Sequence, residues 1–118
     1  MRFRPEQHLR RPGEFRRVRE EGRRLPGELF TLWWLPRPDT PELRRLGVVA
    51  STVAVGHAVL RNRAKRRLRE VFRRHQALLP PAGDLILSAR GAINRRPFTV
   101  LEQEFILACR KLSPVSHA

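Results

Sequence analysis

The stretch Arg61-Asn62-Arg63-Ala64-Lys65-Arg66-Arg67-Leu68-Arg69-Glu70-Val71-Phe72-Arg73-Arg74 organises this chain. It contains eight basic residues and a single acidic residue, Glu70. The apolar positions recur at helical spacing and fall within about 100° of a helical wheel; they are Ala64, Leu68, Val71 and Phe72. The pattern predicts a long helix over 58–79 that buries one narrow edge and presents a dense cationic surface.

This cationic surface has two interpretations, an ordinary solvated helix face or a binding surface for an anionic partner. Acidic residues do not alternate with the bases, so pairs such as Lys65 and Arg69 repel by on the order of a few tenths of a kcal/mol. The unneutralised charge favours the anionic partner. The formal net charge is +14, and all but two of the 25 basic residues, Lys65 and Lys111, are arginine. Because arginine forks onto phosphate and stacks on bases, the composition favours nucleic acid.

Length and composition predict one domain over 1–118, with 1–8 a loose basic arm and 113–118 a frayed tail. The single cysteine, Cys109, excludes an intrachain disulfide and fits a small core residue. No apolar run reaches the roughly 20 residues that span a bilayer, and the N-terminus lacks a hydrophobic signal region. We therefore expect a cytoplasmic protein with no membrane partner.

The remaining elements follow from apolar periodicity and end signals. We expect a helix over 13–22, a strand over 28–35, a strand starting at 46, a strand over 84–90 and a helix over 99–112. The second strand extends to about 55 with a bend near 51. Thr99 and Glu102 form a capping-box pattern at the last helix. The order predicts an α+β fold, a small sheet with helices packed against it.

Residues for protein-based catalysis are not clustered in the sequence. The eleven acidic residues form no metal-binding motif, and the four histidines are scattered. No phosphate-binding glycine loop or nucleophile motif is present. We expect no catalytic residue and no metal site on the chain, so any chemistry would come from the partner.

The stretch Gly56-His57-Ala58-Val59-Leu60-Arg61-Asn62-Arg63-Ala64-Lys65-Arg66-Arg67-Leu68-Arg69-Glu70-Val71-Phe72-Arg73 resembles the protein subunit of bacterial ribonuclease P. That family carries Arg-Asn-Arg followed by a spaced Lys-Arg and Arg-Glu on a long helix. Three more segments agree in order and extend the resemblance over roughly 9–112: Leu9 with Phe15 and Val18, the stretch 30–35 followed by 47–49, and the strand 84–90.

The resemblance implies an α-β-β-β-α-β-α fold with a left-handed β-α-β crossover around the long helix. It requires one more strand before that helix, so 46–55 could hold two strands, or 29–35 could divide differently. The implied function is removal of the 5′ leader from precursor tRNA. A large RNA with bound magnesium would catalyse the hydrolysis, and the protein would bind that RNA and the leader without an obligate protein partner.

The resemblance also carries roles onto particular positions. The residues implied to contact the catalytic RNA are Arg61, Asn62, Arg63, Lys65, Arg66, Arg69 and Arg73. The residues implied to line the leader cleft are Phe15, Arg16, Arg19, Trp33 and Ser51, with Trp34 then in the core.

The sequence departs from the family pattern at two places. Arg19 stands where many members have a second aromatic residue, and 51–54 reads Ser-Thr-Val-Ala where many have a basic pair. We hypothesise that Arg16, Arg17 or Arg19 supplies the missing charge.

Two other functions fit a basic chain. One is a ribosomal or RNA-scaffold protein without a processing role, against which the spaced Arg-Asn-Arg and Arg-Glu pattern argues. The other is a protein-only endonuclease, which the scattered carboxylates disfavour.

Overall fold

The long basic helix forms where the sequence predicts it. The computed structural model describes residues 7–37 and 43–112, and in it α3 spans Ala58–His75. One 3-10 turn, η2 (Gln76–Leu78), continues it, so the expected 58–79 helix is confirmed with a tighter last turn. The four predicted apolar positions are fully buried: Ala64, Leu68, Val71 and Phe72. The other sides of α3 remain available for charge.

Four strands form one mixed sheet in the order β1-β2-β4-β3. The strands are β1 (Arg23–Pro26), β2 (Phe30–Pro36), β3 (Arg44–Val49) and β4 (Gly83–Ala89). β2 is antiparallel to both β1 and β4, whereas β3 and β4 are parallel neighbours. Helix α3 therefore lies in a β-α-β crossover between β3 and β4. That this crossover is left-handed remains a prediction, made from the family resemblance.

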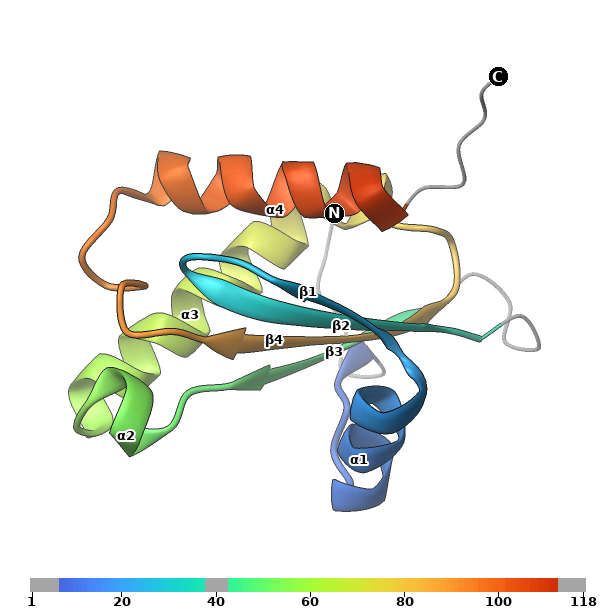
Figure 1. The fold of residues 1–118 in the computed structure, drawn as a ribbon, viewed down its shortest axis with the longest axis horizontal. Coiled ribbons are helices and arrows are strands. Elements are labelled where there is room, and N and C mark those ends of the chain that lie inside the picture. Colours follow the sequence, from blue (N-terminus) through green and yellow to red (C-terminus); the bar gives the residue numbers. More distant parts are fainter. Residues whose placement is uncertain (1–6, 38–42, 113–118) are drawn as a thin grey trace.

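Helices cover both faces of this sheet (Figure 1). α3 and α4 (Phe98–Leu112) pack on one face, and α1 (Pro12–Glu21) packs on the other. The larger core lies beneath α3 and α4 and includes Trp34, which is 3% exposed. A smaller cluster lies beneath α1, where Trp33 packs against Val18 and Ile86. The two adjacent tryptophans thus point to opposite faces, as their strand alternation predicts.

The third strand before α3 is β1, which the sequence reading missed. The alternative of two strands within 46–55 is wrong, and the extra strand lies instead just before 29–35, among the neighbours of that stretch. The second strand does not extend to about 55 either, because β3 ends at Val49 and the chain forms the short helix α2 (Thr52–Val55). Ser51 caps α2 by accepting a hydrogen bond from the Ala54 amide at 3.1 Å. Gly56, with φ of 115°, ends α2 in a conformation that favours glycine.

Two predictions about chain ends need correction. α4 begins at Phe98, so Thr99 lies inside its first turn and Glu102 instead pairs with His75 at 2.9 Å. The capping box is therefore wrong. Gln7 and His8, placed in a loose arm, are packed: the Gln7 side-chain amide donates to the Gln76 side chain at 2.8 Å. The rest of that arm and the tail 113–118 lie outside the described residues.

The α+β class is confirmed, and the element order agrees with α-β-β-β-α-β-α once the short α2 is added. Within 7–37 and 43–112, no helix has the length and apolarity needed to cross a bilayer.

Candidate RNA-binding surfaces

Helix α3 carries cations that no carboxylate in residues 7–37 and 43–112 neutralises. None of them forms an ion pair within the described part of the chain: Arg61, Arg63, Lys65, Arg66 and Arg69. Asn62 is exposed beside them. Arg63 lies toward Arg67, whose pKa its charge lowers, so we call Asn62 and the other four cations the open flank of α3. Because the opposite edge of α3 is buried in the core, the open flank is held in a fixed row along a rigid helix.

The last turn of α3 is neutralised from within. The Glu70 carboxylate accepts hydrogen bonds from Arg73 at 2.6 Å and from Arg74 at 2.7 Å. These bonds, more than the charges behind them, lower the pKa of Glu70 to about 2. Arg73, expected to contact RNA with the others, is already paired and is a weaker candidate.

The other flank of α3 contacts the start of α4 and the loop before it. The guanidinium carbons of Arg67 and Arg74 lie 5.8 and 4.9 Å from the centroid of the Phe98 ring. Arg67 donates to the Arg96 carbonyl at 2.6 Å, and burial, followed by the charge of Arg63, lowers the pKa of Arg67. This flank connects α3 to the loop before α4, so the two flanks differ in their contacts with the rest of the protein.

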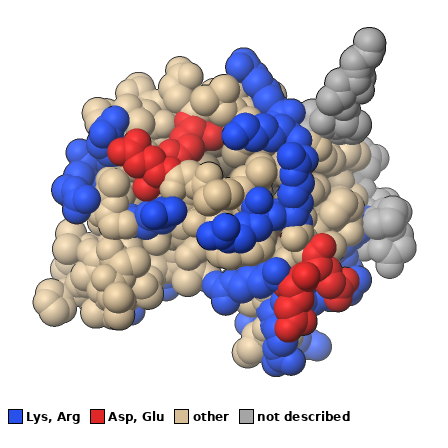
Figure 2. Space-filling model, in the orientation of Figure 1, with Lys and Arg blue, Asp and Glu red and all other residues tan. Residues whose placement is uncertain are grey.

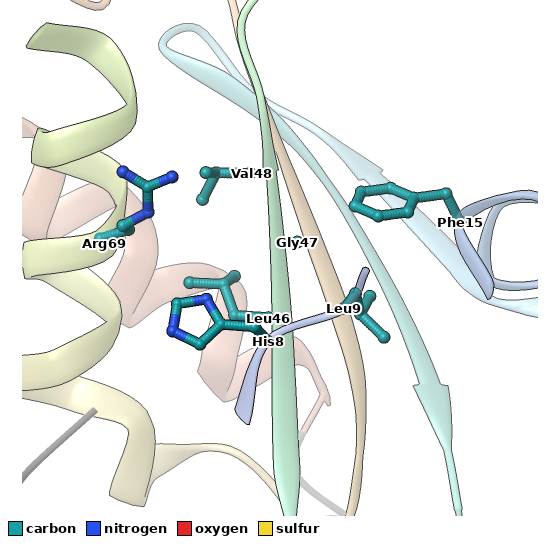
Figure 3. Close-up of a pocket in the computed structure, with 7 residues that line it drawn as sticks. All are labelled: His8, Leu9, Phe15, Leu46, Gly47, Val48 and Arg69. Atoms are coloured by element: carbon teal, nitrogen blue, oxygen red, sulfur yellow. The ribbon is translucent and has the colours of Figure 1, made fainter. Parts of the chain in front are cut away.

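A small pocket of about 90 Å³ lies at the outer edge of β3. Figure 3 shows Phe15 reaching toward it from α1 and Arg69 from α3, on opposite sides of β3. Gly47 admits the ring, because a Cβ at this position would lie 2.5 Å from two carbons of the Phe15 ring. The pocket therefore adjoins both α1 and the open flank of α3.

The segment before α1 completes this pocket. The Leu9 amide donates to the Leu46 carbonyl at 2.9 Å, which places His8 along the edge of β3 (Figure 3). Burial, followed by the charges of Arg10 and Arg69, lowers the pKa of His8. At neutral pH the pocket thus combines a neutral imidazole, a phenyl ring and one guanidinium, groups able to contact a base and a phosphate.

An ionic network fixes α1, and with it Phe15, on the sheet. Glu14 accepts from the amides of Arg10 and Arg11 at the start of α1, both at 3.0 Å. Its other oxygen pairs with Arg45 of β3 at 2.9 Å, and Arg45 also binds Asp84 of β4 at 2.8 and 2.9 Å. The backbone bond from Arg11, ahead of the Arg45 charge, lowers the pKa of Glu14.

Trp33 lies on the α1 face, half-buried, between two arginines. The guanidinium carbon of Arg19 is 5.5 Å from the Trp33 ring centroid, and that of Arg24 is 5.9 Å away. Phe15 and Trp33 pack against the same small cluster, so the structure brings these two predicted cleft residues together. The sequence reading did not include Arg24, which belongs to the edge strand β1 and is placed beside Trp33 by the β1–β2 register.

Two other residues predicted to line the leader cleft have different surroundings. Arg16 is exposed on α1, and Ser51 uses its hydroxyl to cap α2.

In Figure 2, basic side chains spread over much of the visible face, with acidic ones in small groups. Within the described ranges, no group of three or more His, Cys, Asp or Glu could hold a metal ion.

Comparison with known proteins identifies the family to which this chain belongs. A family model described as Ribonuclease P matches residues 3–113. The chain belongs to the ribonuclease P protein family. Its function is that of the protein component of this tRNA-processing endoribonuclease, which decides against the ribosomal or scaffold protein that composition left open.

Two relatives of this ribonuclease P protein illustrate the similarity. The ribonuclease P protein component of Syntrophomonas wolfei is 31% identical over 103 residues, which cover 87% of this chain and 84% of the relative. That of Thermus oshimai is 39% identical over 107 residues, 91% of this chain but 65% of the relative. The chain therefore spans only about two thirds of that second, longer relative.

Solved ribonuclease P proteins share the fold. The RNase P protein from Thermotoga maritima has a TM-score of 0.78 and 25% identity, covering 91% of this chain and 98% of that one. The Staphylococcus aureus RNase P protein has a TM-score of 0.75 and 26% identity, covering 90% and 96%.

Proposed function

We propose that this ribonuclease P protein assembles with ribonuclease P RNA through the open flank of α3 and binds the single-stranded 5′ leader of precursor tRNA on its α1 face. One observation carries the proposal: among the residues that the structure describes, five cations on a rigid helix have no carboxylate partner, whereas their neighbours Arg73 and Arg74 are paired with Glu70. Each phosphate that such a cation neutralises releases counterions, which provides affinity that falls steeply with salt.

The open flank suits a folded RNA better than a small anion. Its side chains extend along several turns of one helix, so they can follow a row of phosphates. Asn62 adds a neutral group that both donates and accepts among the cations. Arg73 contributes only where a phosphate competes with Glu70 for its guanidinium.

The leader is held on the α1 face by charge and stacking. The pocket at β3 offers the Phe15 ring on the α1 side of the strand and Arg69 on the α3 side (Figure 3), and Trp33 with Arg19 continues the α1 face. Arg16 and Ser51 contribute at most at the margins, since one is exposed on α1 and the other caps α2. Rings and guanidinium groups grip single strands with little base-specific reading, so leaders of many sequences would bind.

We propose that the RNA subunit carries the catalytic chemistry. The described part of the chain offers no cluster of metal-binding side chains, so magnesium would be held mainly by the RNA. The protein's part is to bind both RNAs and raise affinity for precursor over mature tRNA. We propose the cytoplasm as its compartment, because precursor tRNA is made there, and we expect no membrane contact and no obligate protein partner.

Reconstitution tests this proposal. The purified protein is mixed with a bacterial ribonuclease P RNA at low magnesium, and cleavage of a precursor tRNA is followed. We expect the protein to stimulate cleavage only when the RNA is present. Cleavage by the protein alone would point to a protein nuclease, and no stimulation at all would contradict the proposed role.

A further inference from the structure

Trp33 is the meeting point of two arginines from different elements. Arg24 of β1 is its cross-strand neighbour, and Arg19 reaches it from the last turn of α1. Their guanidinium carbons lie 5.9 and 5.5 Å from the ring centroid, within the range of cation–π contact. Three elements therefore converge on one half-buried ring.

A tight turn fixes this convergence. Gly22 caps α1 just after its last residue, Glu21: its amide donates to the Val18 carbonyl at 2.8 Å, and β1 begins at the next residue. A Cβ at Gly22 would lie 2.5 Å from the Val18 oxygen and 2.9 Å from the Trp34 oxygen, so only glycine fits without a backbone shift. Arg19 and Arg24 are thus held on either side of a rigid corner.

The two guanidinium groups share this ring without a neutralising acid. In the described part of the chain, neither Arg19 nor Arg24 pairs with a carboxylate, and both side chains are exposed. Arg17, on the same helix, instead forms an ion pair with Glu21 at 3.6 Å. Two like charges at one site repel, and an anion bound between them would relieve that repulsion.

We propose that Arg19, Trp33 and Arg24 form a phosphate-binding site for the leader backbone, with Trp33 acting as the platform that orients the two guanidinium groups. The inference rests on the proposed leader binding and names the chemistry of one part of it. It assigns a role to Arg24 and extends the leader path from the pocket at β3 toward the edge strand β1. It also replaces base stacking on Trp33 with phosphate recognition.

Replacing an arginine by the neutral residue glutamine tests the site. Arg24→Gln and the matched Arg110→Gln, on α4 at the opposite face, remove the same charge from exposed positions. In the reconstituted ribonucleoprotein, Arg24→Gln should weaken binding of precursor tRNA by about fivefold and leave mature tRNA unchanged. The slope of log affinity against log salt should fall by about 0.7, the value for one single-strand phosphate. Equal effects of the two variants would overturn the site.

Leader chemistry distinguishes phosphate from base recognition. A series of precursors carries one neutral methylphosphonate linkage or one abasic nucleotide at each leader position. One methylphosphonate position should reproduce the loss caused by Arg24→Gln and add nothing in that variant, whereas abasic nucleotides there should be tolerated. Loss from the abasic nucleotide alone would show base stacking on Trp33 and overturn the inference.

Phe15→Ala separates failure of this inference from failure of the proposed function. If Phe15→Ala weakens precursor binding and Arg24→Gln does not, the leader binds the α1 face but not this site. If both variants and removal of the leader leave affinity unchanged, leader binding itself is wrong.

Discussion

The Phe15 ring lies directly over Gly47, where a Cβ would come within 2.5 Å of ring atoms Cε2 and Cζ. The contact joins α1 to the edge of β3 and forms one wall of the small pocket. A glycine at 47 thus sets how far the ring can enter the sheet surface, and any larger residue would push it outward.

Gly47→Ala should displace the Phe15 ring from the pocket. Because the clash involves the far end of one side chain, which can rotate away, the free energy of unfolding should fall by only about 1 kcal/mol. Preference for precursor over mature tRNA should fall several-fold, measured by equilibrium binding to the reconstituted complex. In a Phe15→Ala background the Gly47→Ala change should have no further effect; an additive loss would show that Gly47 acts independently of the ring.

Arginines of α3 that are paired with Glu70 should matter less for RNA binding than arginines of α3 that have no such partner. Arg66→Gln removes an unpaired cation and should weaken assembly with ribonuclease P RNA by several-fold, with a shallower salt dependence. Arg73→Gln removes a cation already paired with Glu70 and should have a smaller effect. Filter binding across a salt series measures both variants. Equal losses would mean that pairing with Glu70 does not limit Arg73.

The Glu70 carboxylate should make folding stability depend on pH. Hydrogen bonds from Arg73 and Arg74 lower its pKa from 4.5 in the unfolded chain to about 2. Because the folded pKa is the lower one, this contribution is present above about pH 4.5 and is lost as the pH falls toward 2. Urea denaturation should show Glu70→Gln less stable than the parent at pH 6, with the difference shrinking between pH 4.5 and 2. A constant difference over that range would refute the pairing.

Cys109 should be unreactive in the folded protein. The side chain is 1% exposed in the core beneath α4, and burial raises the pKa of its thiol to about 12. The thiolate fraction at pH 8 should then be roughly a thousandfold below that of an ordinary cysteine, and reagents react with the thiolate. Alkylation should require unfolding by urea. Rapid alkylation of the native protein would contradict the packing of α4.

The main elements of the fold could be predicted from the sequence, because the apolar residues that recur at regular spacing are the ones buried in the structure. The apolar edge of α3, the strand at β4 and the opposed Trp33 and Trp34 all follow from residue spacing, and the structure confirms each of them.

The missed elements have weak local signals. β1 reads Arg-Arg-Leu-Pro, so its strand state comes from pairing with β2 and not from apolar alternation. In α2 the β-branched residues favour a strand, but the Ser51 cap and the positive φ of Gly56 make one helical turn. Glu102 likewise satisfies the capping pattern in the sequence, yet in the structure its carboxylate pairs with His75 of α3.

The candidate surfaces were only partly visible in the sequence. The density of arginine indicated an RNA-binding helix, but which arginines are paired depends on rotamers and on Glu70. Arg24 became a candidate only when the β1–β2 register placed it beside Trp33.

The division of work between α3 and the α1 face is the central claim, and one crossed binding measurement tests it. Two variants, Arg66→Gln and Phe15→Ala, are each titrated against ribonuclease P RNA and, once assembled, against precursor and mature tRNA. Arg66→Gln should weaken assembly with the RNA and leave the precursor-to-mature affinity ratio of the assembled complex intact. Phe15→Ala should do the reverse. If each variant changed both quantities to the same extent, the two surfaces would not be separate, and the account would be contradicted.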